Sequence, residues 1–454
     1  MPKKKTALTI EERLQQALVP AEEQPYEVPE NWVWVRLESV ASWGSGGTPS
    51  RKHEEYYNGD ILWIKTGELN NGWIYDTEEK ITDEGLKKSS AKLFPPYSVL
   101  IAMYGATIGK VAILGVPATT NQACACAVCN QSLLYMYLFY YCISQKNVFI
   151  EKGKGGAQPN ISQIILKQHP IPLPPLSEQQ RIVERIEELF AKLDEAKERL
   201  QEVADSFAVR KAAILHKAFT GALTKQWRLK NGVSDESWEE KNLGDVCSKI
   251  TDGTHNSPTN SLTGEYMYVT AKNIKDTGID LSNITYVTKE IHKEIYSRCD
   301  VVYGDVLYIK DGATAGIATI NTLKEEFSML SSVALIRADL KLATNEFIKT
   351  YLNYRKKEIL KNISGSAITR LTLSKIKNIA ISLPSLPEQH EIVRLIDDLL
   401  ARERSAQQAT EQALASIDLM KKSILARAFR GELGTNKASE ASALELLRQV
   451  LVEN

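Results

Sequence analysis

The sequence has no excess charge of either sign and no hydrophobic run long enough to cross a membrane. Its 454 residues carry 56 basic and 56 acidic side chains, so the formal net charge is zero. A chain that binds nucleic acid by itself usually has a basic surplus, because neutralising phosphates dominates affinity. Any contact with DNA would therefore need local basic groups. The longest apolar run, Leu133–Ile143, is far shorter than the roughly 20 residues of a membrane span, and we predict that it forms a buried helix.

Cysteine is scarce, and its six copies do not form a metal-binding pattern. The cluster Cys124–Cys129 (CACAVC) lacks a second pair at zinc-site spacing, and the six histidines are scattered. We therefore predict no metal site and expect buried strand thiols in a reducing compartment. The opening residues, MPKKKTALT, lack the apolar core of a signal peptide, so we expect a cytoplasmic protein with no membrane contact.

Catalytic motifs are also missing. The sequence contains no Asp/Asn-Pro-Pro-Tyr/Phe motif of the kind that serves amino-methyl transfer. Gly105–Val111 and Gly312–Ala318 resemble a phosphate-binding loop, but the first has the wrong spacing and the second lacks the lysine. Asp60, Glu78 and Lys80 could imitate a nuclease triad, but no equivalent set occurs in the second half. The sequence therefore predicts no catalytic residues and no cofactor of its own.

One segment of the chain occurs twice, 210 residues apart. The matching blocks are Leu173–Ala191 with Leu383–Ala401, and Lys211–Leu223 with Lys421–Leu433. Weaker similarity, at slightly smaller offsets, covers the residues before each block and includes a Gly-Ala-Thr sequence in each half. Surface loops tolerate insertions cheaply, so a constant offset indicates that the length of the repeated segment matters. The chain therefore alternates between segments that differ between the two copies and segments that are repeated at constant length, in the order variable, fixed, variable, fixed.

The fixed segments have the pattern of two long helices that pair. Apolar residues recur at alternating steps of four and three, which is typical of coiled coils. From Ser177, a plausible N-cap, to Lys217, the first helix would be about 60 Å long. The two helices are predicted to bury their stripes against each other, although each could instead pack on its own globular neighbour. The predicted seam comprises Ile182, Ile186, Leu189, Leu193, Leu200, Val203, Phe207, Ile392, Ile396, Leu399, Ile417, Met420 and Ile424.

The variable segments contain short β-branched stretches separated by glycine, and they predict mixed α/β domains. The fold class is therefore α+β, with two globular domains separated by two long helices and an internal pseudo-two-fold repeat. The predicted divisions are an N-terminal helical segment (1–30) packing near the C-terminus, a first domain (31–173), a first helical region (174–234), a second domain (235–383) and a second helical region (384–454).

The blocks PLPPLSEQQRIVERIEELF and KAAILHKAFTGAL, with the opening WVWVRL, resemble the specificity subunit of type I restriction–modification enzymes. The resemblance covers the whole chain. It implies two target-recognition domains and two conserved helices that pair antiparallel. It also implies a non-catalytic subunit that binds bipartite double-stranded DNA. Because two unlike domains would be held apart by helices of fixed length, we expect the target to be asymmetric, with a spacer of fixed length. The partners of the subunit would be two methyltransferase subunits and restriction–translocase subunits, which would carry S-adenosylmethionine and ATP.

Polar and glycine-rich turns in the variable domains are the candidates for DNA contact. Glycine allows close backbone approach, threonine can bind phosphate or base, and amides suit adenine edges. In the first domain the candidates are Thr48, Arg51, Lys52, Lys65, Thr66, Tyr104, Gly105, Thr107, Lys110, Gln158 and Asn160. In the second domain they are Thr254, His255, Lys272, Asn273, Lys310, Asp311, Gly312, Thr314 and Arg370. Any of them could be an ordinary surface residue. A nuclease with its own recognition domains and a coiled-coil interaction protein remain as alternatives.

Overall fold

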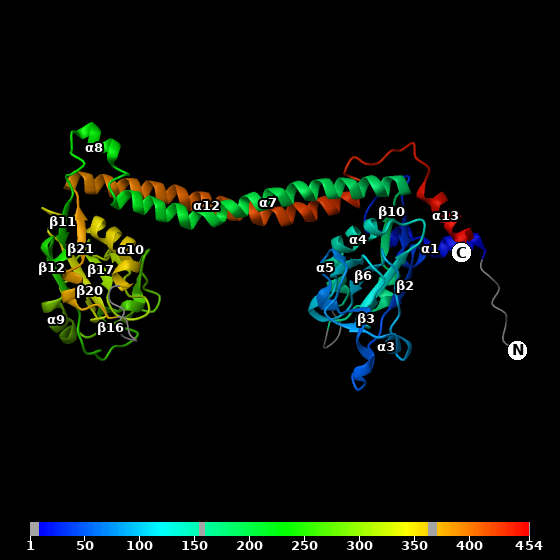
Figure 1. Cartoon of the computed structure of the whole chain (residues 1–454), viewed down its shortest axis with the longest axis horizontal. Coiled ribbons are helices and arrows are strands. Elements are labelled where there is room, and N and C mark those ends of the chain that lie inside the picture. The colour runs from blue at the N-terminus through cyan, green and yellow to red at the C-terminus, as the bar shows by residue number, and fades with distance from the viewer. Residues whose placement is uncertain (1–8, 154–158, 362–369, 454) are drawn as a thin grey trace. The chain divides into compact units, whose positions relative to one another are not determined.

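The chain forms two compact units, each containing one mixed domain and half of a helical pair. A computed structural model describes residues 9–153, 159–361 and 370–453. The first unit comprises Met1–Leu200 with Gln412–Asn454, and the second comprises Gln201–Glu411. The predicted α+β organisation with two long helices is confirmed (Figure 1). None of the helices in the described ranges is long and apolar enough to cross a membrane.

The first domain is built around a five-stranded sheet. Its order is β2 (Ala41–Ser45), β9 (Cys124–Cys129), β6 (Val99–Ala102), β7 (Val111–Leu114) and β4 (Trp73–Ile74). A second sheet has the order β5 (Lys80–Ile81), β3 (Tyr57–Ile64) and β8 (Thr119–Thr120). A third joins β1 (Val33–Arg36) to β10 (Pro170–Leu173). The predicted strands at 61–65, 99–104 and 110–114 therefore lie in β3, β6 and β7.

Short helices complete the first domain. They are α2 (Leu37–Val40), α3 (Asp83–Lys87), α4 (Tyr135–Ser144), α5 (Lys146–Lys152) and α6 (Gln163–Lys167), with 3₁₀ turns at Glu54–Tyr56, Thr66–Glu68 and Gly105–Thr107. The buried helix predicted over Leu133–Ile143 corresponds to α4. The central strand β6 is buried on both faces, and its side chains alternate between two clusters as strand geometry requires. Val99 and Ile101 pack with α4, whereas Leu100 and Ala102 pack with β3.

The second domain repeats this plan with its own loops. A four-stranded sheet has the order β12 (Cys247–Asp252), β20 (Val333–Ala338), β17 (Val306–Ile309) and β18 (Ala318–Ile320). The second sheet is β16 (Thr285–Val287), β13 (Tyr266–Val269) and β19 (Phe327–Met329). Two pairs complete it: β11 (Glu239–Asn242) with β21 (Ala380–Leu383), and β14 (Ile274–Lys275) with β15 (Gly278–Ile279). Its helices are α9 (Lys289–Arg298), α10 (Asn345–Lys361) and α11 (Leu373–Lys377), with 3₁₀ turns at Leu243–Asp245 and Ala271–Asn273.

The two ends of the chain pack together within the first unit. The N-terminal helix α1 (Ile10–Ala17) lies against the C-terminal helix α13 (Ala443–Glu453), and a 3₁₀ turn (Ala21–Glu23) follows α1. Leu14 and Leu447 belong to the same buried cluster, and the Arg13 guanidinium donates to the Leu451 carbonyl at 3.2 Å. Thr9 caps α1 in a capping box with Glu12.

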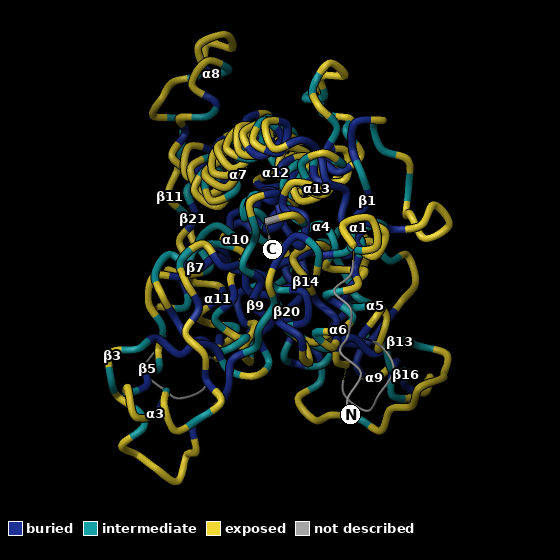
Figure 2. Tube along the Cα trace, turned by 90° about the vertical axis from the view of Figure 1, so that its right-hand side faces the viewer, coloured by how far each residue is buried: buried dark blue, intermediate teal, exposed yellow. Residues whose placement is uncertain are grey.

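Two helices of nearly equal length form the repeated part: α7 (Leu176–Phe219) and α12 (Leu386–Ala428). In the first unit Asp194 accepts from Lys421 at 2.5 Å. In the second unit Glu403 accepts from Arg210 at 2.9 Å. The partner number falls as the α7 number rises, so the helices pair antiparallel. Figure 2 shows the exposed outer face of α7.

The predicted seam is partly displaced. Val203 is 42% exposed and Met420 is 50% exposed, so neither lies in the seam as predicted. Their neighbours Ala204 and Lys421 face the partner helix instead. An α-helix drifts relative to a strict heptad, so an apolar pattern can place a seam position one residue too early. The helix also begins at Leu176, so the prediction of Ser177 as its N-cap is wrong.

A buried glutamine at the start of each long helix fixes the adjacent domain. The Gln389 amide accepts from the Thr344 backbone N–H at 2.9 Å and donates to the Leu342 and Pro384 carbonyls at 2.9 and 2.8 Å. Gln179 makes the same three bonds in the first unit, to Leu134, Ser132 and Pro174. These bonds explain why the glutamine of the Glu-Gln pair recurs in both copies.

Replacing Gln389 by leucine is expected to destabilise the second unit by about 2–4 kcal/mol. The variant leaves two buried backbone groups, the Thr344 N–H and the Pro384 carbonyl, and the partly buried Leu342 carbonyl without this partner, and each unmade buried bond costs about 1–3 kcal/mol. Chemical denaturation measures the loss. His390→Leu is the matched control, because His390 is the exposed neighbour on the same turn and should change stability little. An equal effect of both variants would contradict this role for Gln389.

Candidate nucleic-acid interface

The Gly-Ala-Thr turn of the first domain follows β6 and is exposed. Gly105 has a φ of 61°, in the left-handed region that glycine adopts without strain. Its N–H donates to the Pro159 carbonyl at 3.0 Å, and Tyr104 pairs with Asn160 in an antiparallel bridge. The Thr107 hydroxyl donates to the Tyr104 carbonyl at 2.8 Å. The structure therefore brings four candidate residues, Tyr104, Gly105, Thr107 and Asn160, into one surface.

The second domain places its Gly-Ala-Thr turn in the same way after β17. Gly312 has a φ of 94°, and Asp311 pairs with Arg370 in an antiparallel bridge. The Asp311 carboxylate lies 3.6 Å from the Arg370 guanidinium. The repeat thus conserves the backbone of this surface while its side chains change from tyrosine and asparagine to aspartate and arginine.

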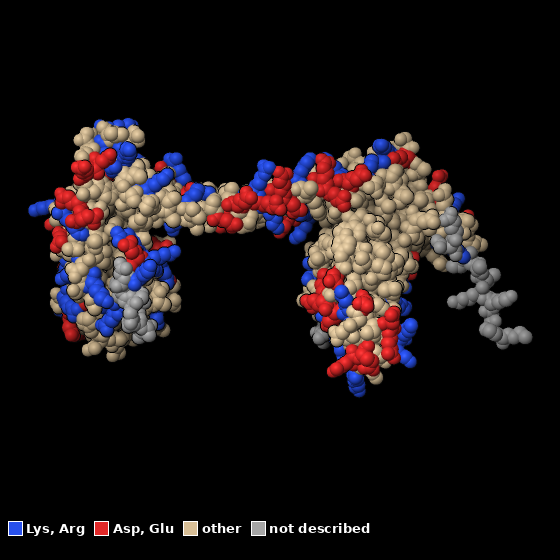
Figure 3. Space-filling view, in the orientation of Figure 1, with Lys and Arg blue, Asp and Glu red and all other residues tan. Residues whose placement is uncertain are grey.

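A lysine that is not among the predicted DNA contacts lies beside each turn. Gly109 and Gly316 follow the turns with φ values of 73° and 85°. The Lys146 stem packs against Gly109, and the Lys356 stem packs against Gly316. Neither lysine makes an ion pair within the described ranges. The signal was the repeat itself, because the two lysines occupy matching positions on α5 and α10. Figure 3 shows Lys and Arg side chains on the face of the second domain that carries α10.

The other candidates of the first domain lie near the 3₁₀ turn at Thr66–Glu68. Glu79 binds both Arg51 at 2.7 Å and Lys65 at 3.0 Å, and Arg51 stacks on Tyr57. The Lys65 and Arg51 charges hold the pKa of Glu79 below its usual value. Glu78 also lies 3.3 Å from the Lys65 ammonium, so two acidic side chains compensate these two basic charges. Thr48 donates to Gln122 at 2.5 Å, whereas Lys52 is exposed.

Two candidates of the second domain are buried and already paired, which corrects the prediction. Lys310 is 2% exposed, and its ammonium lies 3.0 Å from Asp311 and 3.5 Å from Asp252. Asn273 caps its own 3₁₀ turn and donates to the Asp280 carbonyl. A polar residue type does not reveal whether its side chain points outward, and here both point inward.

The remaining candidates are more accessible. Lys272 is exposed and lines a cavity of 730 Å³. His255 contacts Arg298, which forms an ion pair with Asp252, and Thr254 donates to the Asn256 carbonyl. Thr66 and Lys110 are half-buried, and Thr314 is exposed. Gln158 lies outside the described residues.

The described residues contain no metal-site geometry: no group of three or more His, Cys, Asp and Glu side chains converges within them. The six cysteines are free thiols, and burial raises the pKa of Cys126 to about 12. These thiols are therefore protonated near neutral pH and poor ligands.

Two mixed domains with matching backbone turns and different side chains, each attached to the same antiparallel helical pair, define a recognition scaffold. The chain belongs to the family of the type I restriction modification DNA specificity domain, whose model matches residues 29–205 and 235–414. It is a DNA sequence-specificity subunit of a type I restriction–modification enzyme and has no catalytic role of its own. This membership counts against the nuclease and the coiled-coil interaction protein.

Individual relatives match along nearly the whole chain. The EcoKI specificity subunit of Escherichia coli K12 is 26% identical over 454 residues, covering 94% of this chain and 96% of that protein. The MjaIX specificity subunit of Methanocaldococcus jannaschii is 25% identical, covering 83% and 88%. The crystal structure of the HsdS subunit from Thermoanaerobacter tengcongensis has the same fold, with a TM-score of 0.64, 21% identity, and 90% and 100% coverage.

Proposed function

We propose that this chain reads a bipartite, asymmetric DNA target, with one half-site bound by each domain and a spacer of fixed length. The observation that carries the proposal is the repeated Gly-Ala-Thr surface with different side chains. Tyr104 and Asn160 flank it in the first domain, and Asp311 and Arg370 flank it in the second. Amide and guanidinium groups select different base edges, so two domains of one fold would read two sequences.

The proposed partners are two methyltransferase subunits and restriction–translocase subunits. The relatives are specificity subunits of type I restriction enzymes, which supports an assembly of this kind. S-adenosylmethionine and ATP would be bound by those partners rather than by this chain. The proposed location is the cytoplasm, where the chromosomal target lies.

Exchanging residues 31–173 for the first domain of another specificity subunit is expected to change one half-site only. The second half-site and the spacer length should remain, because residues 235–383 and both long helices are untouched. Sequencing of methylated adenines in cells that express the partner subunits measures the target. The matched control exchanges residues 235–383 and should change the other half-site. A change of both half-sites in either exchange would overturn the one-domain, one-half-site assignment.

A further inference from the structure

The first domain carries a partly exposed cluster of aromatic rings that the DNA-reading surface does not use. This aromatic cluster consists of Trp73, Tyr75, Tyr97 and Tyr135. The Trp73 ring lies 6.1 Å from that of Tyr75, 6.1 Å from that of Tyr97 and 5.9 Å from that of Tyr135, and the Tyr97 and Tyr135 rings are 5.0 Å apart. Tyr75 is 63% exposed and Tyr97 is 56% exposed. Contiguous exposed aromatic surface of this kind marks interaction sites.

Tyr97 occupies a backbone conformation that favours glycine. Its φ is 67°, which is an outlier for a bulky residue. The repeat supplies the comparison, because the matching residue of the second domain is Gly304, with a φ of 91°. The Tyr97 N–H donates to the Leu114 carbonyl and the Gly304 N–H donates to the Asn321 carbonyl, both at 2.8 Å. The first domain therefore retains a strained tyrosine at a turn that its own copy builds with glycine, and such strain points to a function of the side chain.

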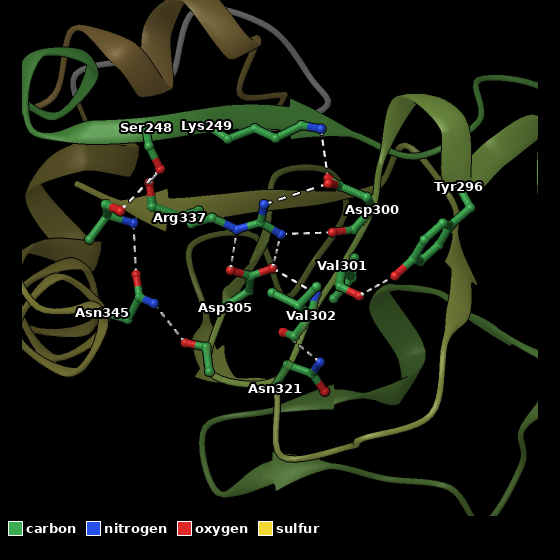
Figure 4. Close-up of polar contacts among 12 residues, drawn as sticks. Ser248, Lys249, Tyr296, Asp300, Val301, Val302, Asp305, Asn321, Arg337 and Asn345 are labelled. Carbon is green, nitrogen blue, oxygen red and sulfur yellow. Dashed lines mark hydrogen bonds and ion pairs between the residues drawn. The ribbon is translucent and has the colours of Figure 1, made fainter. Parts of the chain in front are cut away.

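The second domain has a polar network at the corresponding place. Tyr135 begins α4, and the matching Asn345 begins α10. Asn345 donates to the Gly304 carbonyl at 2.9 Å, next to the pair in which Arg337 donates twice to Asp305. Figure 4 shows this network between β12, β20 and the segment that precedes β17. The polar groups at this place in the second domain are hydrogen-bonded to one another, and only the first domain has the aromatic cluster there.

Charge at the edge of the cluster restricts what could cover it. Burial raises the pKa of Tyr135, and the neighbouring Tyr97 and the Glu187 carboxylate of α7 raise it further. Figure 3 shows a broad area without charged side chains over α4, and both acidic and basic side chains along the adjoining part of the helices. Arg185 and Lys192 of that part of α7 are both ion-paired with Glu188. A nucleic acid would need basic groups beside stacked rings. A second copy of this chain would bring two acidic edges together in an isologous contact.

We propose that the aromatic cluster is a docking surface for an apolar patch with an adjacent arginine or lysine on a different protein chain, and that this chain is a methyltransferase subunit of the assembly. The identity of the partner rests on the proposed function. Exposed tyrosine and tryptophan rings supply large contact areas at low entropy cost and dominate many interfaces. A cation beside the rings would contact both the π faces and the Glu187 carboxylate. Because the second domain lacks the rings, the two sides of the assembly would bind their methyltransferase subunits unequally.

Tyr97→Gly separates docking from folding. The variant adopts the residue of the second domain, so the melting temperature of the isolated chain should stay the same or rise. Its affinity for the co-expressed methyltransferase subunit, measured by titration calorimetry, should fall at least tenfold for one of the two binding steps. Tyr97→Phe keeps the ring and should bind as the wild type does. Glu187→Gln should weaken the same step severalfold and reduce its dependence on salt.

The matched control is Tyr303→Ala, which removes an exposed tyrosine beside Gly304 in the second domain and should leave both binding steps unchanged. Wild-type affinity of Tyr97→Gly for the methyltransferase subunit would overturn the docking proposal while leaving the proposed function intact. A loss of DNA binding by Tyr97→Gly without a loss of subunit binding would also overturn it. Absence of any binding between the wild-type chain and the subunit would instead contradict the proposed function.

Discussion

Lengthening both long helices by one heptad is expected to lengthen the DNA spacer by about three base pairs while keeping both half-sites. Seven residues add about 10 Å to a helix, and B-DNA rises about 3.4 Å per base pair. The insertion should duplicate Ala196–Glu202 in α7 and Ala406–Gln412 in α12. It then falls between the Asp194–Lys421 contact and the Arg210–Glu403 contact, so both contacts are retained.

The physical reason is that a heptad returns a helix to nearly the same face. The inserted segments can pair with each other, and each existing half of the seam keeps its register. Sequencing of methylated adenines would show loss of methylation at the original sites and its appearance at sites with the longer spacer. The control inserts the heptad into α7 alone, which cannot keep both interhelical ion pairs and should abolish methylation. New half-sites with an unchanged spacer would show that helix length does not set the spacing.

The architecture could be predicted because the same segment occurs twice in the sequence. A constant offset of 210 residues required two long segments of equal length, and the paired helices α7 and α12 have 44 and 43 residues. The Gly-Ala-Thr turns that follow Tyr104 and Asp311 could also be predicted, because the same three residues occur in both halves. The prediction failed where a shift of one residue along a helix decides whether a side chain faces the partner helix. Val203 and Met420 were predicted to lie in the seam but are exposed.

Side-chain environments were harder to predict than topology. Lys310 has the residue type of a DNA contact, but its ammonium is buried between Asp252 and Asp311, which come from different parts of the chain. The aromatic cluster was missed for a related reason. Trp73 and Tyr135 are 62 positions apart and follow no common period, so only the folded sheet and α4 bring them together.

Replacing Arg228 by methionine is expected to destabilise the second unit by about 3 kcal/mol, because it leaves a buried carboxylate without its cation. Arg228 lies in α8 (Lys225–Asn231), in the connector between α7 and the second domain. Its guanidinium donates to Glu388 at 2.6 Å and to the Gly221 carbonyl at 2.8 Å. Glu388 is fully buried at the start of α12 and also accepts from Thr224 at 2.6 Å.

The first unit shows how neutral donors can hold the matching carboxylate. Glu178 accepts from Trp32 at 2.8 Å and from Asn436 at 2.9 Å, and burial raises its pKa. In the second unit the matching Trp238 N–H and one Glu388 oxygen are buried without a hydrogen-bond partner among the described residues. Reorientation of Glu388 toward Trp238 would recover part of the loss, so we expect the lower end of the range for breaking a buried ion pair.

The double variant Arg228→Met/Glu388→Gln tests whether charge is the cause. A neutral amide of the same shape can still bond Thr224 and Trp238, so at least half of the lost stability should return. Denaturation midpoints measure the recovery, and hydrogen exchange at the start of α12 locates it in the second unit. Lys230→Met removes an exposed charge from the same helix and should have little effect, because exposed charges contribute little to stability. Equal stability of the single and double variants would mean that packing of the arginine, and not its charge, holds the connector against α12.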